Sequence, residues 1–88
     1  MGDENIIRAL REQIRDLETQ RNALIDERAR RLGHARIEID LVLDSLGYLT
    51  ASPDLQPEKF DPDGELRRMT RQLADLRKAL AEQEEDAA

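Results

Sequence analysis

Two heptad-patterned segments of unequal length constrain the fold of this chain most strongly. Apolar residues recur at three- and four-residue spacing over residues 3–50, and again over residues 62–86. This period is typical of amphipathic helices that pack side by side. At 1.5 Å per residue, helices of these lengths would measure about 70 Å and about 37 Å. The pattern predicts an all-α antiparallel hairpin with a long N-terminal helix and a shorter C-terminal helix.

The unequal lengths also predict assembly. If the second helix packs against residues 28–50, the N-terminal part of the first helix has no partner within the chain. We therefore expect coiled-coil or helical-bundle oligomerisation, most simply a homodimer. The apolar residues expected at the oligomer or partner interface are Ile7, Leu10, Ile14, Leu17, Leu24, Ile25, Leu32, Ile39, Leu43 and Leu46. Those expected to pack the hairpin are Leu66, Met69, Leu73, Leu76 and Leu80.

The composition supports a single helical domain over residues 1–88. Charged residues make up 39% of the chain, while aromatic residues make up 2%. Long helices and coiled coils have such a composition, and so few aromatic residues cannot fill a wide globular core. The chain therefore has to gain much of its buried surface from helix pairing.

A proline-containing loop separates the two segments at residues 51–61. Pro53 and Pro57 interrupt a helical hydrogen-bond ladder. The run Asp61-Pro62-Asp63 predicts a helix start, with an aspartate as cap and a proline at the first position. The same run resembles part of a calcium loop, but it lacks the remaining ligand spacing. Residues 82–88 are acidic and should fray, because acid at a helix C-terminus opposes the macrodipole.

Gly33 and the residues after it allow two interpretations. A glycine within a helix costs roughly 1 kcal/mol relative to alanine, so Gly33 could mark a bend or the end of the first helix. We expect a continuous, slightly bent helix. Residues 36–43 alternate as a strand would, but Ile39 and Leu43 also continue the seven-residue stripe. We predict helix there, apolar over most of its circumference and buried between the returning helix and another subunit.

Arginines continue the apolar seam of the first helix at Arg21, Arg28 and Arg31. Arginine at a core position weakens an interface but can determine register or partner choice. The alternative, which we favour, is that these side chains extend to solvent at the edge of a stripe that has shifted after Leu24.

The charge distribution limits the classes of partner that the chain can bind. The net charge is −6, and residues 37–88 hold all of the acidic excess. An acidic chain is a poor candidate for direct binding of nucleic acid, which requires cationic contacts. The chain has no cysteine, and no apolar run is long enough to cross a bilayer. The N-terminus lacks the basic residues of a signal peptide, so we expect a cytoplasmic protein without membrane contact.

The sequence contains few residues that could form a catalytic or metal-binding site. His34 is the single histidine, and no phosphate loop or metal-spaced cluster is present, so no catalytic residue, cofactor or metal is expected. The only locally basic stretch contains Arg28, Arg30, Arg31 and Arg36, which could hold an anion or an acidic partner. The alternative is a solvated face paired with the nearby Asp26, Glu27 and Glu38.

One family resemblance covers about residues 4–29. The residues Ala9-Leu10-Arg11-Glu12, Ile14, Leu17, Ala23-Leu24 and Glu27-Arg28 resemble the first helix of the all-helical chorismate mutases. The resemblance implies a helical dimer in which Arg11 and Arg28 contact a dicarboxylate substrate. The rest of the chain departs from the family, because Ile39 stands in register with a family lysine and the later acidic and glutamine positions are missing.

These observations favour a non-enzymatic interaction protein. We expect a self-assembling hairpin that acts as an assembly, adaptor or regulatory factor, of the kind found among small phage or bacterial accessory proteins. A diverged mutase-like dimer is the enzymatic alternative. A third possibility is a small regulator whose acidic C-terminal half docks onto a nucleic-acid-binding protein.

Overall fold

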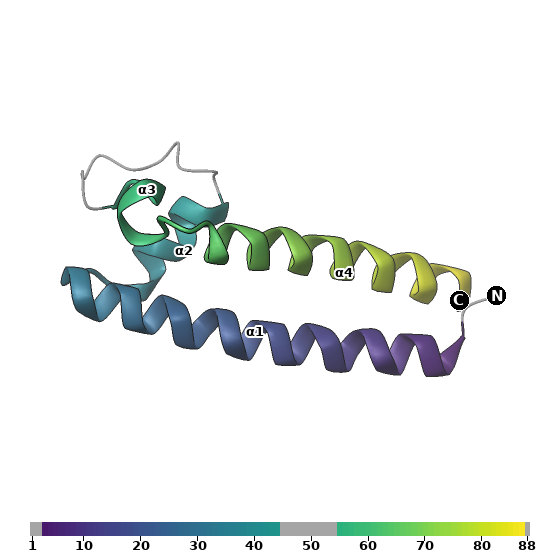
Figure 1. The fold of residues 1–88 in the computed structure, drawn as a ribbon. Coiled ribbons are helices and arrows are strands. Elements are labelled where there is room, and N and C mark those ends of the chain that lie inside the picture. Colours follow the sequence, from purple (N-terminus) through teal and green to yellow (C-terminus); the bar gives the residue numbers. More distant parts are fainter. Residues whose placement is uncertain (1–2, 45–54, 88) are drawn as a thin grey trace.

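The computed structural model is all-α, as the sequence predicts, and it describes residues 3–44 and 55–87. Within those ranges it contains the helices α1 (Glu4–Leu32), α2 (Arg36–Asp44), α3 (Pro57–Phe60) and α4 (Glu65–Ala87). The two long helices, α1 and α4, pack antiparallel and form the body of the molecule (Figure 1). The molecule measures 47 × 22 × 20 Å, and the described parts of the two ends of the chain lie at the same end of the hairpin.

The prediction that α4 packs against residues 28–50 is wrong. Cross-helix contacts join Arg11 to Glu84, Glu18 to Arg77 and Arg21 to Thr70, so α4 runs beside residues 11–21 of α1, which lie outside the predicted range. The N-terminal seam therefore has an intrachain partner, and Ile14 at its centre is buried. The error follows from the predicted length of the first helix, which exceeds the observed one.

The first helix ends at Leu32 and does not continue to residue 50. Asp3 caps its N-terminus by accepting a hydrogen bond from the Asn5 backbone N–H. At the other end Gly33 adopts the left-handed conformation, with φ +72°, and donates its N–H to the Ala29 carbonyl. The His34 N–H reaches the same carbonyl at 3.0 Å. This arrangement is a common helix C-cap and turns the chain back toward the hairpin.

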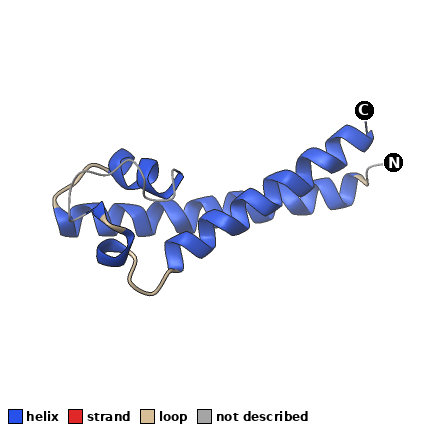
Figure 2. Ribbon diagram, turned by 90° about the horizontal axis from the view of Figure 1, so that it is seen from above, coloured by secondary structure: helices blue, strands red, loops and turns tan. Residues whose placement is uncertain are grey.

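The ambiguous segment is helical, as predicted, and forms α2. It buries Ile39, Val42 and Leu43 but leaves Ile37 66% and Leu41 50% exposed. In the single chain this helix is therefore buried on one side only, and its burial against another subunit stays a prediction. In the view from above, α2 lies on one side of α1 and the start of α4 lies on the other (Figure 2).

The core lies where α2, α3 and α4 meet the C-terminal half of α1. It comprises Ile25, Ala29, Ile39, Val42, Leu43, Leu55, Phe60 and Leu66, with Leu24 and Leu32 packed against it. We refer to this end of the molecule as the head. Beyond the head the hairpin consists of α1 and α4 alone. Leu46, Pro53 and the first part of the predicted loop lie outside the described residues.

Asp61 starts α4, as the sequence predicts. Its buried carboxylate accepts hydrogen bonds from the Leu66 N–H at 2.9 Å, the Arg67 N–H at 3.1 Å and the Arg67 Nε–H at 3.0 Å. Gly64, with φ +74°, lets the chain turn between the aspartate and the helix. The calcium-like run is thus used for capping, and the predicted start at residue 62 lies three residues before the observed helix.

Candidate protein-interaction face

One side of the α1–α4 hairpin is closed by polar contacts at heptad spacing. Arg11 pairs with Glu84 at 3.6 Å, and Glu18 accepts from Arg77 at 3.0 Å. We refer to this side as the bridged face. Exposed ion pairs contribute little energy individually, but their repetition along both helices favours the observed register.

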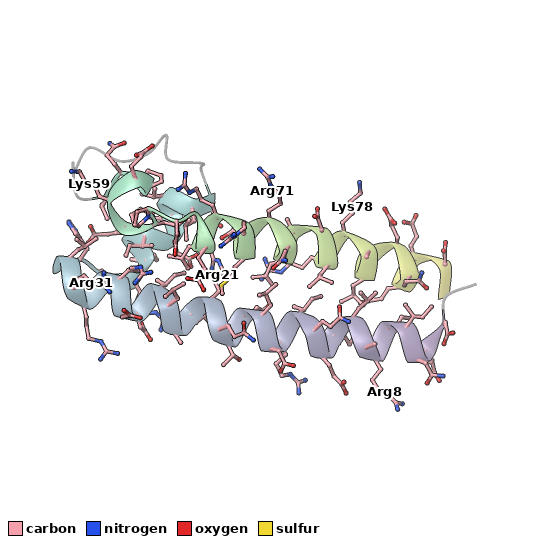
Figure 3. The ribbon with its side chains drawn as sticks, viewed as in Figure 1. Arg8, Arg21, Arg31, Lys59, Arg71 and Lys78 are labelled. Carbon is pink, nitrogen blue, oxygen red and sulfur yellow. The ribbon has the colours of Figure 1, made fainter. Side chains whose placement is uncertain are left out.

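Arg21 closes the bridged face near the head, and the sequence reasoning missed its role. Its Nε donates to the Thr70 hydroxyl at 2.9 Å, and its terminal nitrogen donates to Asp40 at 2.8 Å. The side chain is only 10% exposed and points between α1 and α4 (Figure 3). Arg21 therefore occupies a core position, contrary to the expectation that it extends to solvent. Its place in the apolar seam was the signal that could have identified it.

The opposite side of the hairpin has a different character, and we refer to it as the open face. Two adjoining hollows follow the groove between α1 and α4 on this side. Their apolar lining residues are Leu17, Ala23, Leu24, Met69 and Leu76, and their amide residues are Gln13, Gln20 and Gln72. The acidic residues that line them are Asp16, Glu27, Glu65 and Asp75. No residue of α2 or α3 lines either hollow in the part of the chain that the structure describes.

The apolar stripe of the open face extends toward the N-terminus of α1. Leu10 is seven residues before Leu17, and Ile6 is eleven residues before it, which is close to three full turns. Leu10 is half-buried and Ile6 is 45% exposed. Within residues 3–44 and 55–87, no ion pair crosses from α1 to α4 on this side. The open face therefore offers an apolar strip that runs along most of the hairpin.

The residues predicted for an oligomer interface divide into two groups. Ile14, Ile25, Ile39 and Leu43 are buried within the single chain. Ile7, Leu10, Leu17, Leu24 and Leu32 are half-buried. Of the residues predicted to pack the hairpin, Leu66 and Leu73 are buried, whereas Met69, Leu76 and Leu80 are half-buried. Leu17, Leu24, Met69 and Leu76 are the members of these sets that line the open face.

The basic stretch near the head is largely paired with carboxylates. Arg31 pairs with Glu27 at 2.7 Å, and Arg36 pairs with Asp26 at 2.6 Å. Arg28 approaches Glu27 at 3.3 Å, and its buried Nε has no hydrogen-bond partner. Arg30 is exposed. The structure thus favours the ion-paired interpretation of this stretch.

His34 interacts with Glu38 at the start of α2. The Glu38 carboxylate lies 2.9 Å from His34 Nδ1 and accepts from the Ala35 N–H at 3.3 Å. The backbone hydrogen bond from Ala35, followed by the contact with His34, holds the pKa of Glu38 below its usual value. This pair stabilises the first turn of α2. Over the described ranges, the structure contains no group of three or more potential metal-ligating residues.

The two arginines of the mutase resemblance do not converge within the chain. Both lie on α1, and seventeen residues of helix separate them by about 25 Å. Arg11 pairs with Glu84 near the end of the hairpin that is farthest from the head, whereas Arg28 lies near the head. Nothing in the single chain assembles them into one substrate site.

Comparison with known proteins does not assign the chain to a family. No family model, curated protein or solved structure matches it. No helix among the described residues is long and apolar enough to cross a membrane.

Proposed function

We propose that this protein is a helical interaction module whose open face packs against the open face of a second copy. Two hairpins would then form a four-helix bundle. The observation that carries this proposal is the asymmetry of the hairpin: ion pairs bridge one face, and its hollows are lined mostly by charged residues, while the other face keeps half-buried leucines and a methionine beside glutamines.

The burial of the open-face residues supports a docking role. Leu17, Leu24, Met69 and Leu76 touch the neighbouring helix but keep part of their surface in the groove. A third or fourth helix placed along the groove would remove that remaining apolar area from water, at about 25 cal/mol per Å². Four-helix bundles bury such positions in the same way.

The size of the open face fits a dimer. The molecule is 47 Å long and about 20 Å wide, so one face has an area comparable with the roughly 800 Å² per partner buried in a stable interface. The leucines and the methionine that line the central groove are half-buried, whereas its glutamines and three of its four carboxylates are exposed. Such a distribution is typical of an interface with an apolar core and a polar rim.

Isosteric charge insertion tests this proposal. Gln13 and Gln72 are exposed on the open face, so the double variant Gln13→Glu/Gln72→Glu should fold as the wild type does. It would bury four carboxylates in the dimer interface, and we expect it to be monomeric by light scattering at concentrations where the wild type is dimeric.

The matched control is Gln56→Glu, because Gln56 is exposed and precedes α3 in the head. This variant should keep the wild-type mass, and circular dichroism should show equal helix content in all three proteins. A Gln13→Glu/Gln72→Glu protein that stays dimeric would contradict the proposal.

A further inference from the structure

The outward surface of α4 carries opposite charges at its two ends. Arg68 and Arg71 are exposed near the N-terminus of α4, and Glu82, Glu85 and Asp86 are exposed near its C-terminus. Arg68 and Arg71 lie four residues, about one helical turn, before Gln72 and Asp75, which line the open face, so they stand at its edge on α4. Among residues 3–44 and 55–87, none of the five residues at the two ends has an ion-pair partner.

This order of charges is unfavourable within α4 itself. A helix N-terminus carries partial positive charge and favours acidic side chains, while its C-terminus favours basic ones. α4 begins with the favourable Glu65, but it places Arg68 at the end of its first turn, Asp86 in its last turn, and no basic residue in that last turn. The stability of the isolated helix therefore does not explain the arrangement, whereas contact with an oppositely directed copy does.

We infer that the two copies of the bundle are related by a two-fold axis perpendicular to the helices, which places the α4 helices antiparallel with their heads at opposite ends. This inference rests on the proposed function. In this arrangement Arg68 lies opposite Asp86 of the second copy, and Arg71 lies opposite its Glu82. Each pair occurs twice in the dimer.

One position of the axis satisfies all of these pairs. Residues 68 and 86, and residues 71 and 82, share a midpoint near Leu76 and Arg77. The two α4 helices run in opposite directions in this arrangement, so their dipoles attract each other.

The same axis avoids like-charge contacts along α1. The contact between Glu18 and Arg77 puts Glu18 at the level of the axis. Asp16 then lies opposite Gln20 of the second copy, which is uncharged. Leu17 lies within one residue of the axis, so two leucines from the two copies meet at the centre of the interface.

A parallel arrangement, with both heads at one end, matches the charges less well. It would place α4 of one copy against α1 of the other at the same level. The observed contacts between Arg11 and Glu84 and between Glu18 and Arg77 set those levels. Arg68 would then lie opposite Glu27, but Arg71 would lie opposite Leu24, Glu82 opposite Gln13 and Asp86 opposite Ala9, so only one of the four residues would face an opposite charge.

Charge reversal tests the pairing. The variants Arg68→Glu/Arg71→Glu and Glu82→Arg/Asp86→Arg should each raise the dimer dissociation constant roughly tenfold or more, because four like-charge contacts replace four attractive ones. Each change also makes the charges of α4 more favourable to its dipole, so helix content should not fall. A merely structural role for these residues would not combine weaker dimerisation with an undiminished helix.

The quadruple variant with all four reversals should restore dimerisation to near the wild-type value. Arg8→Glu/Arg15→Glu is the matched control, because it makes the same change of net charge on exposed residues of α1. Dissociation constants unchanged by both double reversals, or a quadruple variant as weak as either, would overturn the inferred pairing.

Distances between spin labels separate this inference from the proposed function. The chain has no cysteine, so Glu58→Cys in the head and Ala74→Cys near the axis give single exposed attachment sites. Glu65 lies about eleven residues from the axis, so head-to-head labels should be at least about 35 Å apart, with a shorter distance for residue 74. A dimer with similar short distances for both labels would refute the antiparallel arrangement and leave the proposed function intact. The absence of any intermolecular distance would refute both.

Discussion

Replacing the buried carboxylate of Asp61 should lower the stability of the protein more than replacing any other polar group in the head. Replacing it by alanine removes the acceptor for the backbone N–H groups of Leu66 and Arg67 and for the Arg67 Nε–H. Leu66 is fully buried, so its N–H cannot be satisfied by water after the change. The Asp61→Ala variant therefore loses a helix cap and leaves an unpaired buried donor.

These losses set the expected size of the effect. Loss of a cap costs about 0.5–2 kcal/mol, and an unsatisfied buried donor costs about 1–3 kcal/mol. We expect Asp61→Ala to lower the free energy of unfolding by about 3 kcal/mol. For a domain of this size, each kcal/mol corresponds to about 4–8 °C in melting temperature, so the melting temperature should fall by about 12–24 °C.

Asp63 supplies the matched control two residues away. It also accepts a hydrogen bond at the start of α4, from the Glu65 N–H at 3.2 Å, but it is exposed. Water can replace its carboxylate, so Asp63→Ala should cost less than about 1 kcal/mol. Thermal unfolding by circular dichroism should be compared at one protein concentration, because dimerisation would contribute to stability.

The comparison of the two aspartates can refute the reasoning directly. Equal melting temperatures for Asp61→Ala and Asp63→Ala would mean that burial does not determine the value of these caps. Asp61→Asn should fall between wild type and alanine, because it keeps one acceptor oxygen but loses the charge that faces Arg67.

Three further predictions concern the turn, the buried arginine and the pH dependence. Gly33→Ala should lower the free energy of unfolding by about 1 kcal/mol in urea denaturation, with a smaller loss for Gly33→Asn, because the left-handed conformation and not lack of space requires glycine. Arg21→Met should change the free energy of unfolding by less than about 1 kcal/mol. Asp40→Ala should lower it by about 1–2 kcal/mol, because the buried Arg21 guanidinium loses the carboxylate that lies 2.8 Å away. A larger loss for Arg21→Met than for Asp40→Ala in urea denaturation would contradict this. The folded-state pKa of Glu38 lies below its usual value of 4.5, so its contribution should be present above that pH and lost as pH falls below it; the stability difference between wild type and Glu38→Gln should shrink over that acid range in pH-dependent denaturation.

The sequence predicted the secondary structure of this protein better than its packing. The heptad residues predict that both long segments are helical, because their pattern reports which side of a helix is buried. The cap at Asp61 was readable because capping depends on a few neighbouring residues. The hairpin itself also followed from the sequence.

The length of the first helix could not be predicted in the same way. A glycine inside a heptad pattern fits either a continuous helix or a left-handed cap, with a difference of only about 1 kcal/mol. Burial of Ile39 and Leu43 against Ile25 favours the cap, and such tertiary contacts are not visible in the pattern. Because the first helix was predicted to be too long, α4 was predicted to pack against residues 28–50 and not against the N-terminal part of α1.

The open face could be anticipated only in part. Four residues were recognisable as seam residues: Leu17, Leu24, Met69 and Leu76. The sequence does not show, however, which side of the contact between α1 and α4 carries the polar bridges. Arg21 determines that choice near the head through Thr70, a residue 49 positions away in the sequence. Such a long-range contact requires the structure.

The mass of the wild-type protein in solution tests the central claim most directly. Light scattering coupled to size-exclusion chromatography should be run over a hundredfold range of loading concentrations. The open face predicts a mass approaching twice the 10.1 kDa of one chain at the upper concentrations. A mass of one chain throughout that range would contradict the claim that the open face pairs with a second copy.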